Sequence, residues 1–401
     1  MKKSVNDLLN NVSSGTTVSV RADFNVPISG ALVVDPVRID RALPTLEKLS
    51  AAGVRTVILS HLGRPGGTED PQFSLGPVAT YLATQGNFPV KSASSAVGED
   101  ARAAVAALND GDVLLLENTR FLPGETQNDP SLGAEWASWS DHFVNDAFGT
   151  AHRAHASTDA LPRAVRAKGG LAVAGLLLEL ELQYLGKALS DPDRPFVGVL
   201  GGAKISGKID VIEALLPITD SLLIGGAMAN TFFRALGLET GNSLVEPDKV
   251  ELAKDLLDRA GSGLVLPVDC RIGTSIDPGA ETTVVDRSDV PENQSIGDIG
   301  PTTEALFGER IREAETVVWN GPMGVFEMDN FAGGTFALAE AAAGAADEGT
   351  TVIIGGGDSG AAAEAAGVAN RITHISTGGG ASLEFLAGRP LPGVEALSDR
   401  S

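Results

Sequence analysis

The segment Thr350-Thr351-Val352-Ile353-Ile354-Gly355-Gly356-Gly357-Asp358-Ser359-Gly360 changes character in its middle. Its first half is apolar and β-branched, which favours a buried strand, and this half stops at three glycines. The alanine-rich residues 361–366 follow and favour a helix. A strand, a tight turn and a helix N-terminus in that order indicate an α/β fold. They direct free backbone N–H groups and the positive end of a helix dipole at one spot, which suits an anion.

The glycines of this turn fit more than one kind of site. Gly355, Gly357 and Gly360 have the G-x-G-x-x-G spacing of a dinucleotide fingerprint, which expects an acidic residue about 20 positions on. Residues 373–378 supply no acid there. Asp358 would repel a bare pyrophosphate, but a carboxylate suits this turn when a divalent cation lies between it and the phosphates. A turn that needs glycines and binds nothing is the remaining alternative.

The composition narrows the class of protein. The chain has 401 residues, of which 43% are hydrophobic, so two domains with sizeable cores are expected. A net charge of −22 argues against nucleic-acid and membrane partners. The single cysteine, Cys270, allows no disulfide framework, no signal peptide begins the sequence, and no apolar run reaches membrane-spanning length. We therefore expect a cytoplasmic protein.

Strand-like apolar runs alternate with helical patterns in both halves of the chain. The predicted strands lie at residues 17–20, 56–59, 113–116 and 143–144, and then at 196–200, 222–224, 264–266, 316–319, 351–354 and 372–375. The helical patterns include residues 37–52, 101–108, 249–260 and 334–346. This alternation predicts parallel sheets covered on both faces. Residues 268–285 are the exception and favour extra antiparallel structure.

A leucine-rich stretch at residues 175–189 marks a boundary. It predicts a helix that is apolar on most sides, and it ends at the break Ser190-Asp191-Pro192-Asp193-Arg194-Pro195. We interpret it as a helix between two lobes, residues 1–174 and 190–377.

Two lysines follow the predicted strand at residues 196–200. The spacing matches the start of a P-loop, with Gly202, Gly207 and Lys208 at the G-x-x-x-x-G-K positions. The next position should be the Ser or Thr that holds Mg²⁺, and it is Ile209. A helix that begins near Gly202 would instead place Lys204 and Lys208 one turn apart on the same face, where an anion would relieve their repulsion. Two solvated lysines are the alternative. After another strand, Trp319-Asn320-Gly321-Pro322 forms a turn, and Glu327 is a candidate acceptor for ribose hydroxyls.

Basic residues follow four successive strands in the first half of the chain. His61 and Arg64 follow the second strand, Arg120 the third and Arg153 the fourth. Since the carboxyl ends of parallel strands share one edge of a sheet, we expect these side chains to converge on a carboxylate or phosphate. Arg38 opens the next helical run, and the Asp23-Phe24-Asn25 turn offers groups that grip a hydroxyl.

Together these motifs resemble the phosphoglycerate kinase family from end to end. The matching segments, in family order, are Asp23-Phe24-Asn25-Val26-Pro27, Ser60-His61-Leu62-Gly63-Arg64-Pro65, Glu117-Asn118-Thr119-Arg120-Phe121, Asp146-Ala147-Phe148-Gly149-Thr150-Ala151-His152-Arg153, Gly201-Gly202-Ala203-Lys204, Gly225-Gly226-Ala227-Met228-Ala229-Asn230-Thr231-Phe232, Trp319-Asn320-Gly321-Pro322, Gly356-Gly357-Asp358-Ser359 and Ser376-Thr377-Gly378-Gly379-Gly380-Ala381-Ser382.

The resemblance implies Mg²⁺-dependent transfer of the acyl phosphate of 1,3-bisphosphoglycerate to ADP. It implies two Rossmann-like lobes joined by an inter-lobe helix and hinge, with residues 390–401 returning to the first lobe. The glycerate ligand would be held by Asp23, Asn25, Arg38, His61, Arg64, Arg120 and Arg153. The nucleotide would be held by Lys204, Lys208, Asn320, Glu327, Gly356, Gly357, Asp358 and Ser359. Arg38 and Lys204 would act on the phosphoryl group, Asp358 would lie near Mg²⁺, and the family's habit favours a monomer.

Two positions depart from the family pattern. The Asp298-Ile299-Gly300-Pro301 motif is preceded by Ile296-Gly297, which bears on the adenine contact, and the helix at 175–189 is unusually leucine-rich and acidic. Two other classes stay open at this stage, a nicotinamide-dependent oxidoreductase and a non-catalytic protein that closes on a phosphorylated metabolite. An assay for ATP formation separates all three.

Overall fold

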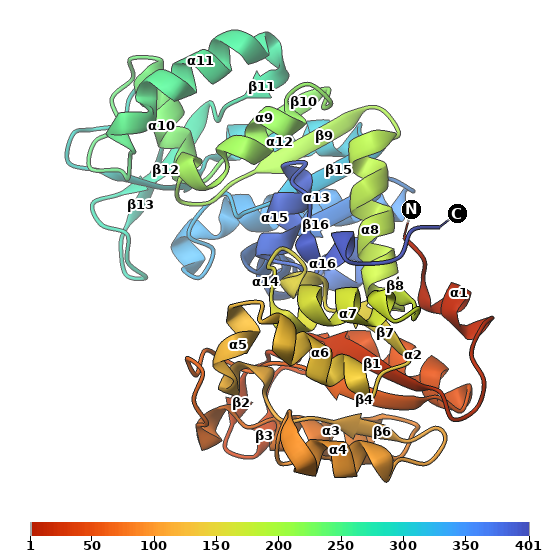
Figure 1. The fold of residues 1–401 in the computed structure, drawn as a ribbon. Helices are drawn as coiled ribbons and strands as arrows, with labels where there is room; N and C mark the ends of the chain where they lie inside the picture. The colour runs from red at the N-terminus through yellow and green to blue at the C-terminus, as the bar shows by residue number, and fades with distance from the viewer. Residues whose placement is uncertain (1, 401) are drawn as a thin grey trace. The chain divides into compact units, whose positions relative to one another are not determined.

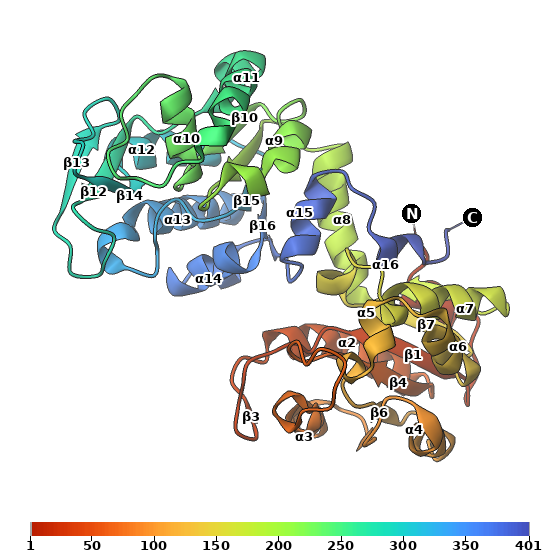
Figure 2. The same ribbon diagram turned by 60° about the vertical axis from the view of Figure 1, so that its left-hand side comes forward.

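The computed structural model describes residues 2–400 and divides into two compact units. The first unit comprises the chain up to Gln183 together with the chain from Pro390 onward. The second unit is Tyr184–Arg389. Figures 1 and 2 show a twisted sheet flanked by helices in each unit. The prediction of an α/β protein with parallel sheets is confirmed.

The first unit is built on a six-stranded parallel sheet in the order β5-β6-β4-β1-β7-β8. Its strands are β1 (Thr17–Ala22), β4 (Arg55–Leu59), β5 (Val90–Ser92), β6 (Val113–Leu115), β7 (His142–Asp146) and β8 (Ala172–Ala174), with a small hairpin of β2 (Ile28–Ser29) and β3 (Leu32–Val33). Its helices are α1 (Val5–Leu9), α2 (Val37–Ala51), α3 (Gly76–Gln85), α4 (Gly98–Ala106), α5 (Pro123–Thr126), α6 (Pro130–Ser138), α7 (Leu161–Ala167) and α16 (Pro392–Glu395). Short 3-10 turns lie at Pro71–Phe73, Thr119–Phe121 and Phe148–Thr150, and a π-helical turn lies at Ala156–Ala160.

The second unit has a six-stranded parallel sheet in the order β11-β10-β9-β15-β16-β17 and a three-stranded antiparallel sheet in the order β13-β12-β14. Its strands are β9 (Phe196–Leu200), β10 (Ser221–Ile224), β11 (Leu264–Val265), β12 (Asp269–Gly273), β13 (Thr282–Asp286), β14 (Ser295–Ile299), β15 (Thr316–Asn320), β16 (Thr351–Gly355) and β17 (His374–Ile375). Its helices are α9 (Ile209–Leu215), α10 (Met228–Ala235), α11 (Val250–Ala260), α12 (Pro301–Arg312), α13 (Gly333–Asp347), α14 (Gly357–Ala365) and α15 (Gly380–Leu386). Short 3-10 turns lie at Ile205–Gly207, Pro247–Lys249, Gly261–Gly263, Asp329–Phe331 and Ala369–Arg371.

The predicted parallel strands all appear, and two strands of the extra antiparallel sheet, β12 and β13, lie where residues 268–285 predicted them. The strands that were missed are β2 and β3 of the small hairpin, β14 of the antiparallel sheet, and β5 and β8 of the first parallel sheet. Strands β5 and β8 are three residues long and lie at the two edges of the first sheet, where a strand needs only one hydrogen-bonded neighbour. Val90-Lys91-Ser92 and Ala172-Val173-Ala174 are too short to show a periodicity, so the sequence alone gives them little signal.

Helix α8 (Leu176–Ser190) runs from the first unit into the second. Its buried residues are Leu177, Leu178, Glu181, Leu185 and Ala188, which recur at helical spacing along one stripe. Leu180, by contrast, is 37% exposed. The prediction of a helix apolar on most sides therefore overstates its burial, because part of its leucine content lies outside the buried stripe.

The chain from Pro390 onward packs on the first unit. Ser398 N donates to Ala172 O at 2.7 Å, and Lys3 N donates to Ser398 O at 2.8 Å. Arg166 Nη1 donates to Ala396 O at 3.1 Å. Residues near both ends of the chain thus complete the sheet edge at β8.

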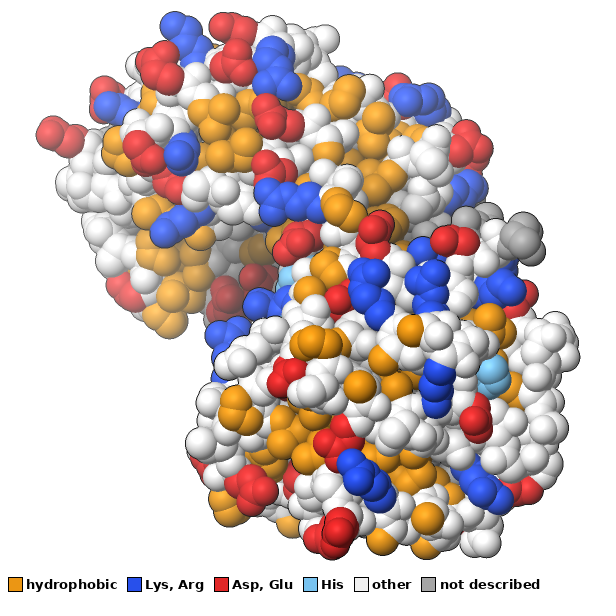
Figure 3. Space-filling view, in the orientation of Figure 1, with side chains coloured by type: hydrophobic (Ala, Val, Ile, Leu, Met, Phe, Trp, Pro, Cys, Tyr) orange, Lys and Arg blue, Asp and Glu red, His pale blue; other side chains and the backbone are white. Residues whose placement is uncertain are grey.

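The surface in Figure 3 carries acidic and basic side chains interspersed over the visible face, with apolar side chains in small groups between them. Among residues 2–400, no helix combines the length and apolar character needed to cross a membrane.

Tight helix packing at Gly133 gives a stability prediction. A Cβ at Gly133, inside α6, would lie 2.7 Å from the Ala160 carbonyl carbon, whereas a Cβ at Gly186, inside α8, meets nothing within 4 Å. We expect Gly133→Ala to destabilise the protein by about 1–3 kcal/mol through overpacking. Gly186→Ala, the matched control, should stabilise it by up to about 1 kcal/mol through helix propensity. Scanning calorimetry should show midpoints that shift in opposite directions, and a neutral Gly133→Ala would contradict the packing described.

Candidate active site

The loops after β1 and β4 meet at the carboxyl edge of the first sheet. Arg38 Nη1, at the start of α2, donates to Asp23 Oδ2 at 3.0 Å. The other carboxylate oxygen of Asp23 lies 3.9 Å from His61 Nδ1. Asn25 Oδ1 accepts a hydrogen bond from Gly63 N at 2.8 Å. The structure therefore brings Asp23, Arg38 and His61 together, and it ties the loop that carries Asn25 to the loop that carries Arg64.

Three arginines surround this edge, and they differ in how far they are buried. Arg120 is partly buried, and its Nη1 donates to Gly63 O at 2.8 Å. Arg64 and Arg153 are exposed, and Arg153 Nε lies 3.1 Å from His152 Nε2. Arg120 is thus held in the protein framework, whereas the guanidinium groups of Arg64 and Arg153 extend into solvent from neighbouring loops.

A buried network lies beneath these residues. Arg21 is fully buried in β1 and donates to Ser157 Oγ at 2.8 Å, to the carbonyl of Ala22, and to His61 Nδ1 at 3.0 Å. Ser157 in turn donates from its hydroxyl to Glu125 at 2.6 Å and from its backbone N–H at 2.9 Å. Glu125 is also fully buried and is the anionic counterpart of Arg21.

The electrostatics of this edge favour an anionic ligand. Burial lowers the pKa of His61 well below its ordinary value, and the charges of Arg21, Arg120 and Arg38 lower it further. Burial and the same arginine neighbourhood lower the pKa of His155 to about 4. Burial also lowers the pKa of Arg120 to about 10, with Arg21 adding to the effect. Both histidines are therefore neutral near pH 7, and the positive charge of the arginines is what a ligand would meet.

Reasoning from the sequence assigned no role to Arg21, Glu125, Ser157 or His155. A structural role for Arg21 could have been predicted, because a charged residue inside a buried parallel strand needs a partner. Glu125 and Ser157 carried none, since their pairing joins segments 32 residues apart.

The carboxyl edge of the second sheet is made of backbone rather than side chains. The strands β9, β10, β15 and β16 are each followed by or end in glycine. A Cβ at Gly201 would lie 2.1 Å from Pro322 O, and a Cβ at Gly321 would lie 2.3 Å from Gly201 O. Only glycine permits this approach of one loop to the next. The loops are hydrogen-bonded to each other there, since Gly201 N donates to Asn320 O at 3.0 Å.

The prediction of a helix that begins near Gly202 is wrong. Gly202 has φ +106° and Lys204 is extended, so the chain first makes a 3-10 turn at Ile205–Gly207 and enters α9 only at Ile209. The reason is that Gly202 bonds across the glycine edge, since its N–H donates to Pro322 O and its carbonyl accepts from Met228 N, both at 3.0 Å. Lys204 and Lys208 therefore do not share a helix face.

The two lysines lie in different environments. Lys204 is exposed. Lys208 is half-buried, and its Nζ donates to Asn320 O at 3.0 Å and to the Asn320 side-chain oxygen. Burial lowers the pKa of Lys208 to about 8, although the carboxylate of Asp358 opposes this shift. Lys208 and Asp358 are thus close enough to influence each other.

Asn320 and Ser359 fasten the loop after β15 to the start of α14. Asn320 Nδ2 donates to Gly355 O at 2.8 Å, and Gly321 N donates to Ser359 Oγ at 2.6 Å. Both side chains are buried. Their contacts are to the protein backbone, so they shape the edge.

Helix α14 begins at Gly357, earlier than the alanine-rich run alone predicted. Gly356 has φ +94° and is the N-cap, so Asp358 lies in the first helical turn and is exposed. The first N–H groups of the helix have no partner within it. Among residues 2–400, no group of three His, Cys, Asp or Glu side chains is arranged to hold a metal. One exposed carboxylate beside free N–H groups suits an Mg²⁺ ion that takes its other ligands from phosphates and water.

Glu327 is exposed on the loop that follows β15.

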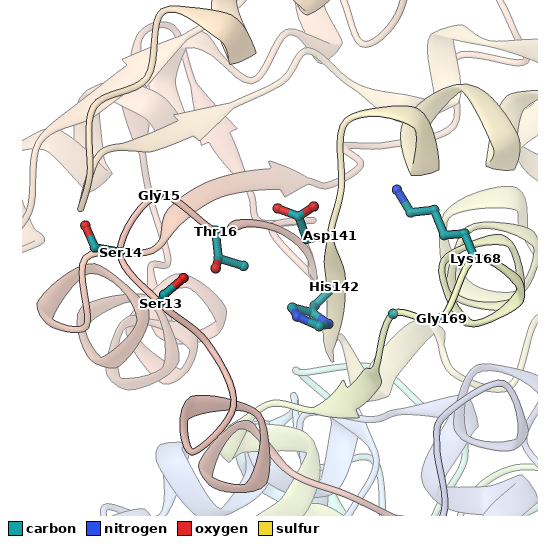
Figure 4. Close-up of a pocket in the computed structure, with 9 residues that line it drawn as sticks. Ser13, Ser14, Gly15, Thr16, Asp141, His142, Lys168 and Gly169 are labelled. Carbon is teal, nitrogen blue, oxygen red and sulfur yellow. The ribbon is translucent and has the colours of Figure 1, made fainter.

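A cavity of about 650 Å³ lies at the opposite, amino-terminal edge of the first sheet (Figure 4). Its polar lining is used by the protein itself. Asp141 accepts from Thr17 N at 2.9 Å, His142 Nδ1 accepts from Leu171 N at 2.9 Å, and Lys168 Nζ donates to Ala137 O. These contacts hold strand ends and loops together, and none of the predicted site residues lines this cavity.

The coupling of Lys208 to Asp358 gives a titration prediction. Because the Asp358 carboxylate raises the pKa of Lys208, Asp358→Asn should lower that pKa below its value of about 8. The shift can be followed by NMR titration of ¹³C-labelled lysine side chains. Glu251→Gln, on the exposed side of α11, is the control and should leave the titration unchanged. An unchanged or higher pKa in Asp358→Asn would show that the two groups do not interact.

The sequence matches the family model described as "Phosphoglycerate kinase" over residues 7–389. The phosphoglycerate kinase of Pelodictyon phaeoclathratiforme is 52% identical over 402 residues, which cover 99% of this chain and 100% of that protein. The protein of that name from Latilactobacillus sakei is 49% identical, covering 96% and 97%. The structure of phosphoglycerate kinase from Coxiella burnetii matches with a TM-score of 0.87 at 38% identity, covering 99% of this chain and 98% of that one. The enzyme from Pyrococcus horikoshii matches with a TM-score of 0.82 at 31% identity and the same coverage. These matches span the sheet edges of both units, and the chain belongs to the phosphoglycerate kinase family.

Proposed function

We propose that the first unit holds the glycerate ligand and the second unit holds the nucleotide in the reaction of this family. The chain is a phosphotransferase, and the reaction is the reversible transfer of a phosphoryl group from 1,3-bisphosphoglycerate to ADP, giving 3-phosphoglycerate and ATP. Family membership sets aside the oxidoreductase and the non-catalytic binding protein. The observation that carries our assignment is the contrast between a cationic side-chain edge in the first unit and a glycine-lined backbone edge in the second.

The cationic edge suits a ligand with a carboxylate and phosphates. Guanidinium forks bind both groups through paired hydrogen bonds, and Arg64, Arg120 and Arg153 surround this edge. The neutral His61 beneath them adds no charge but offers a ring nitrogen. Asp23 and Asn25 supply oxygen atoms for a hydroxyl group. The ligand therefore neutralises charge that the protein leaves uncompensated.

The glycine-lined edge suits a nucleotide. The N–H groups at the start of α14 favour a phosphate, as helix N-termini do generally. Lys208 adds a cation, and Gly356 and Gly357 let the phosphates approach the backbone. Glu327 is placed on the loop after β15, where it would accept hydrogen bonds from ribose hydroxyls.

Asp358 is the residue we assign to Mg²⁺. Its carboxylate would hold the ion at the nucleotide phosphates, and the bound ion would neutralise charge on them. Asp358 makes the otherwise anion-binding helix terminus selective for a phosphate group that carries a cation.

The chemistry needs no protein nucleophile. The attacking oxygen belongs to one ligand and the leaving oxygen to the other, so the protein contributes position and positive charge. Arg38, held by its ion pair with Asp23, and the exposed Lys204 would flank the phosphoryl group during transfer. Direct transfer requires the two ligands to meet, so the two units must approach each other and exclude water during turnover.

We also infer that the enzyme works as a monomer in the cytoplasm. Cys270 is buried, and burial raises its pKa to about 12, so it is a small core residue rather than a reactive thiol. A chain without disulfides suits a reducing compartment. Sedimentation velocity should give the mass of one chain.

Removal of Arg38 tests the catalytic assignment. We expect Arg38→Ala to lower kcat by roughly a thousandfold, because an arginine that stabilises charge in a phosphoryl-transfer transition state contributes on that scale. The rate is measured by coupled detection of ATP formed from ADP and 1,3-bisphosphoglycerate. Arg41→Ala is the matched control, since Arg41 lies one turn further along α2 and is exposed. A loss of less than about tenfold in Arg38→Ala would remove Arg38 from this role.

Removal of the Asp358 carboxylate tests the division between the units. Asp358→Ala should weaken binding of Mg²⁺–ADP far more than binding of 3-phosphoglycerate, as measured by calorimetric titration. Chelation of Mg²⁺ should weaken nucleotide binding strongly in the unchanged protein but much less in the variant. Glu364→Ala, on the exposed side of the same helix, is the control. Equal losses for both ligands in Asp358→Ala would contradict the assignment.

A further inference from the structure

The chain passes between the two units twice, after Gln183 in helix α8 and after Arg389 before the C-terminal segment. On the side of the first unit, both passages are fastened to two adjacent residues, Asn145 and Asp146. These are the last residues of β7, an interior strand of the sheet that lies between β1 and the edge strand β8, and both are buried. Nothing in the reaction of the ligands requires this arrangement.

Asp146 holds the start of α8. Its Oδ1 accepts a hydrogen bond from Leu178 N at 3.1 Å, and Thr45 Oγ1 from α2 accepts from Leu176 N at 2.9 Å. The approach is close, because a Cβ at Gly175 would lie 2.2 Å from Asp146 Oδ1. Two orphan N–H groups of the helix are thereby satisfied from the interior of the first unit.

Asn145 holds the second passage. Its Nδ2 donates to Gly393 O in α16 at 2.9 Å, and its backbone carbonyl accepts from Gly175 N at 2.8 Å, just before α8. Gly393 N in turn donates to Ala151 O at 2.8 Å. The C-terminal segment is therefore clamped between the end of β7 and the 3-10 turn at Phe148–Thr150.

The same short segment leads to the glycerate site. Residues 147–152 connect Asp146 to Arg153, and Ala151 lies two residues before Arg153. Asn145 Oδ1 accepts from Ala147 N at 3.0 Å and so fixes the start of this segment. A displacement of Arg153 toward a ligand would therefore act on the two residues that hold both passages.

We propose that Asn145 and Asp146 are positioning residues that couple occupancy of the glycerate site to both chain passages leaving the first unit. This inference rests on the proposed function, because it takes Arg153 as a ligand of the glycerate. A merely structural role would need only a stable cap for α8. Asp146 is not an optimised cap, since among the described residues its Oδ2 is buried without a hydrogen-bond partner and burial raises its pKa to about 7.

The experiment breaks the Asn145–Gly393 bond from each side in the full-length enzyme. Asn145→Ala removes the donor. Gly393→Ala pushes the C-terminal segment away, because its Cβ would lie 3.0 Å from Ala151 Cα. For each variant, kcat and KM, calorimetric affinities for 3-phosphoglycerate alone and for Mg²⁺–ADP alone, and the thermal midpoint are measured. Glu395→Ala, exposed in the same short helix, is the control.

We expect kcat to fall by about tenfold to a hundredfold in both variants, as for small misplacements remote from the chemistry, with both binary affinities within about threefold of the unchanged enzyme. The double variant should be no slower than the slower single variant, because both changes break one bond. Asp146→Ala should show the same loss of kcat. Asp146→Asn, which keeps the acceptor for Leu178 N, should restore kcat to within about threefold of the unchanged enzyme.

Two results would overturn the inference: a kcat within about twofold of the unchanged enzyme in Asn145→Ala and Gly393→Ala, or a loss of kcat matched by an equal loss of binary glycerate affinity. If Asn145→Ala does not fold, Gly393→Ala and the comparison of Asp146→Ala with Asp146→Asn decide the question. Failure of the proposed function can be distinguished from failure of this inference. If the first unit does not hold the glycerate through Arg153, then Arg153→Ala will leave the affinity for 3-phosphoglycerate unchanged.

Discussion

The carboxyl ends of parallel strands lie at one edge of a sheet, and that constraint places each functional loop of this enzyme. Four consecutive strands of the first sheet, in the order β6-β4-β1-β7, carry the functional loops of the first unit. Loops that are far apart in sequence therefore become neighbours. In the second unit, β9, β10, β15 and β16 do the same. The opposite edge of the first sheet also has a cavity, but there the polar groups close onto strand ends and leave little for a ligand.

We propose that the two sheet edges bind anionic ligands in different ways. The first gathers guanidinium groups and keeps His61 and His155 neutral, so that the arginines set the local charge. Their crowding is tolerable because Glu125 is buried beneath them and Asp23 pairs with Arg38. The second edge uses glycines to bring its loops close together, directs the first N–H groups of α14 outward, and adds only a few side-chain charges. A glycerate with several charged groups suits the first solution, and a chain of phosphates suits the second.

The sequence predicted the α/β architecture, the antiparallel insertion and most strand positions, because apolar runs and glycine turns are local signals. It failed where a distant contact decides the conformation. Lys204 and Lys208 have a helical spacing, but Gly202 bonds to Pro322 and Met228 and prevents the helix. Gly297, next to the position that departs from the family pattern beside the Asp298 motif, packs against Phe331, since a Cβ there would lie 2.3 Å from that ring. No sequence pattern within residues 290–300 predicts that contact.

Aspartates in three strands cap helices elsewhere in the chain, and the balance between burial and hydrogen bonding shifts their pKa values in different directions. Asp269 is buried, which raises its pKa, but Thr303 and Thr302 donate three hydrogen bonds at 2.6–2.9 Å and bring the net shift downward. Asp298 receives N–H bonds from Gly334 and Ile299, and burial still raises its pKa to about 7. Asp146 reaches the same value with one of its oxygens unpartnered among the described residues. Hydrogen bonds to the charged form thus overcome desolvation only at Asp269. Asp269 and Asp298 cap α12 and α13, which stay within one unit, whereas Asp146 caps α8, which leaves its unit. The unpartnered oxygen of Asp146 leaves fewer hydrogen bonds to break when the start of α8 rearranges.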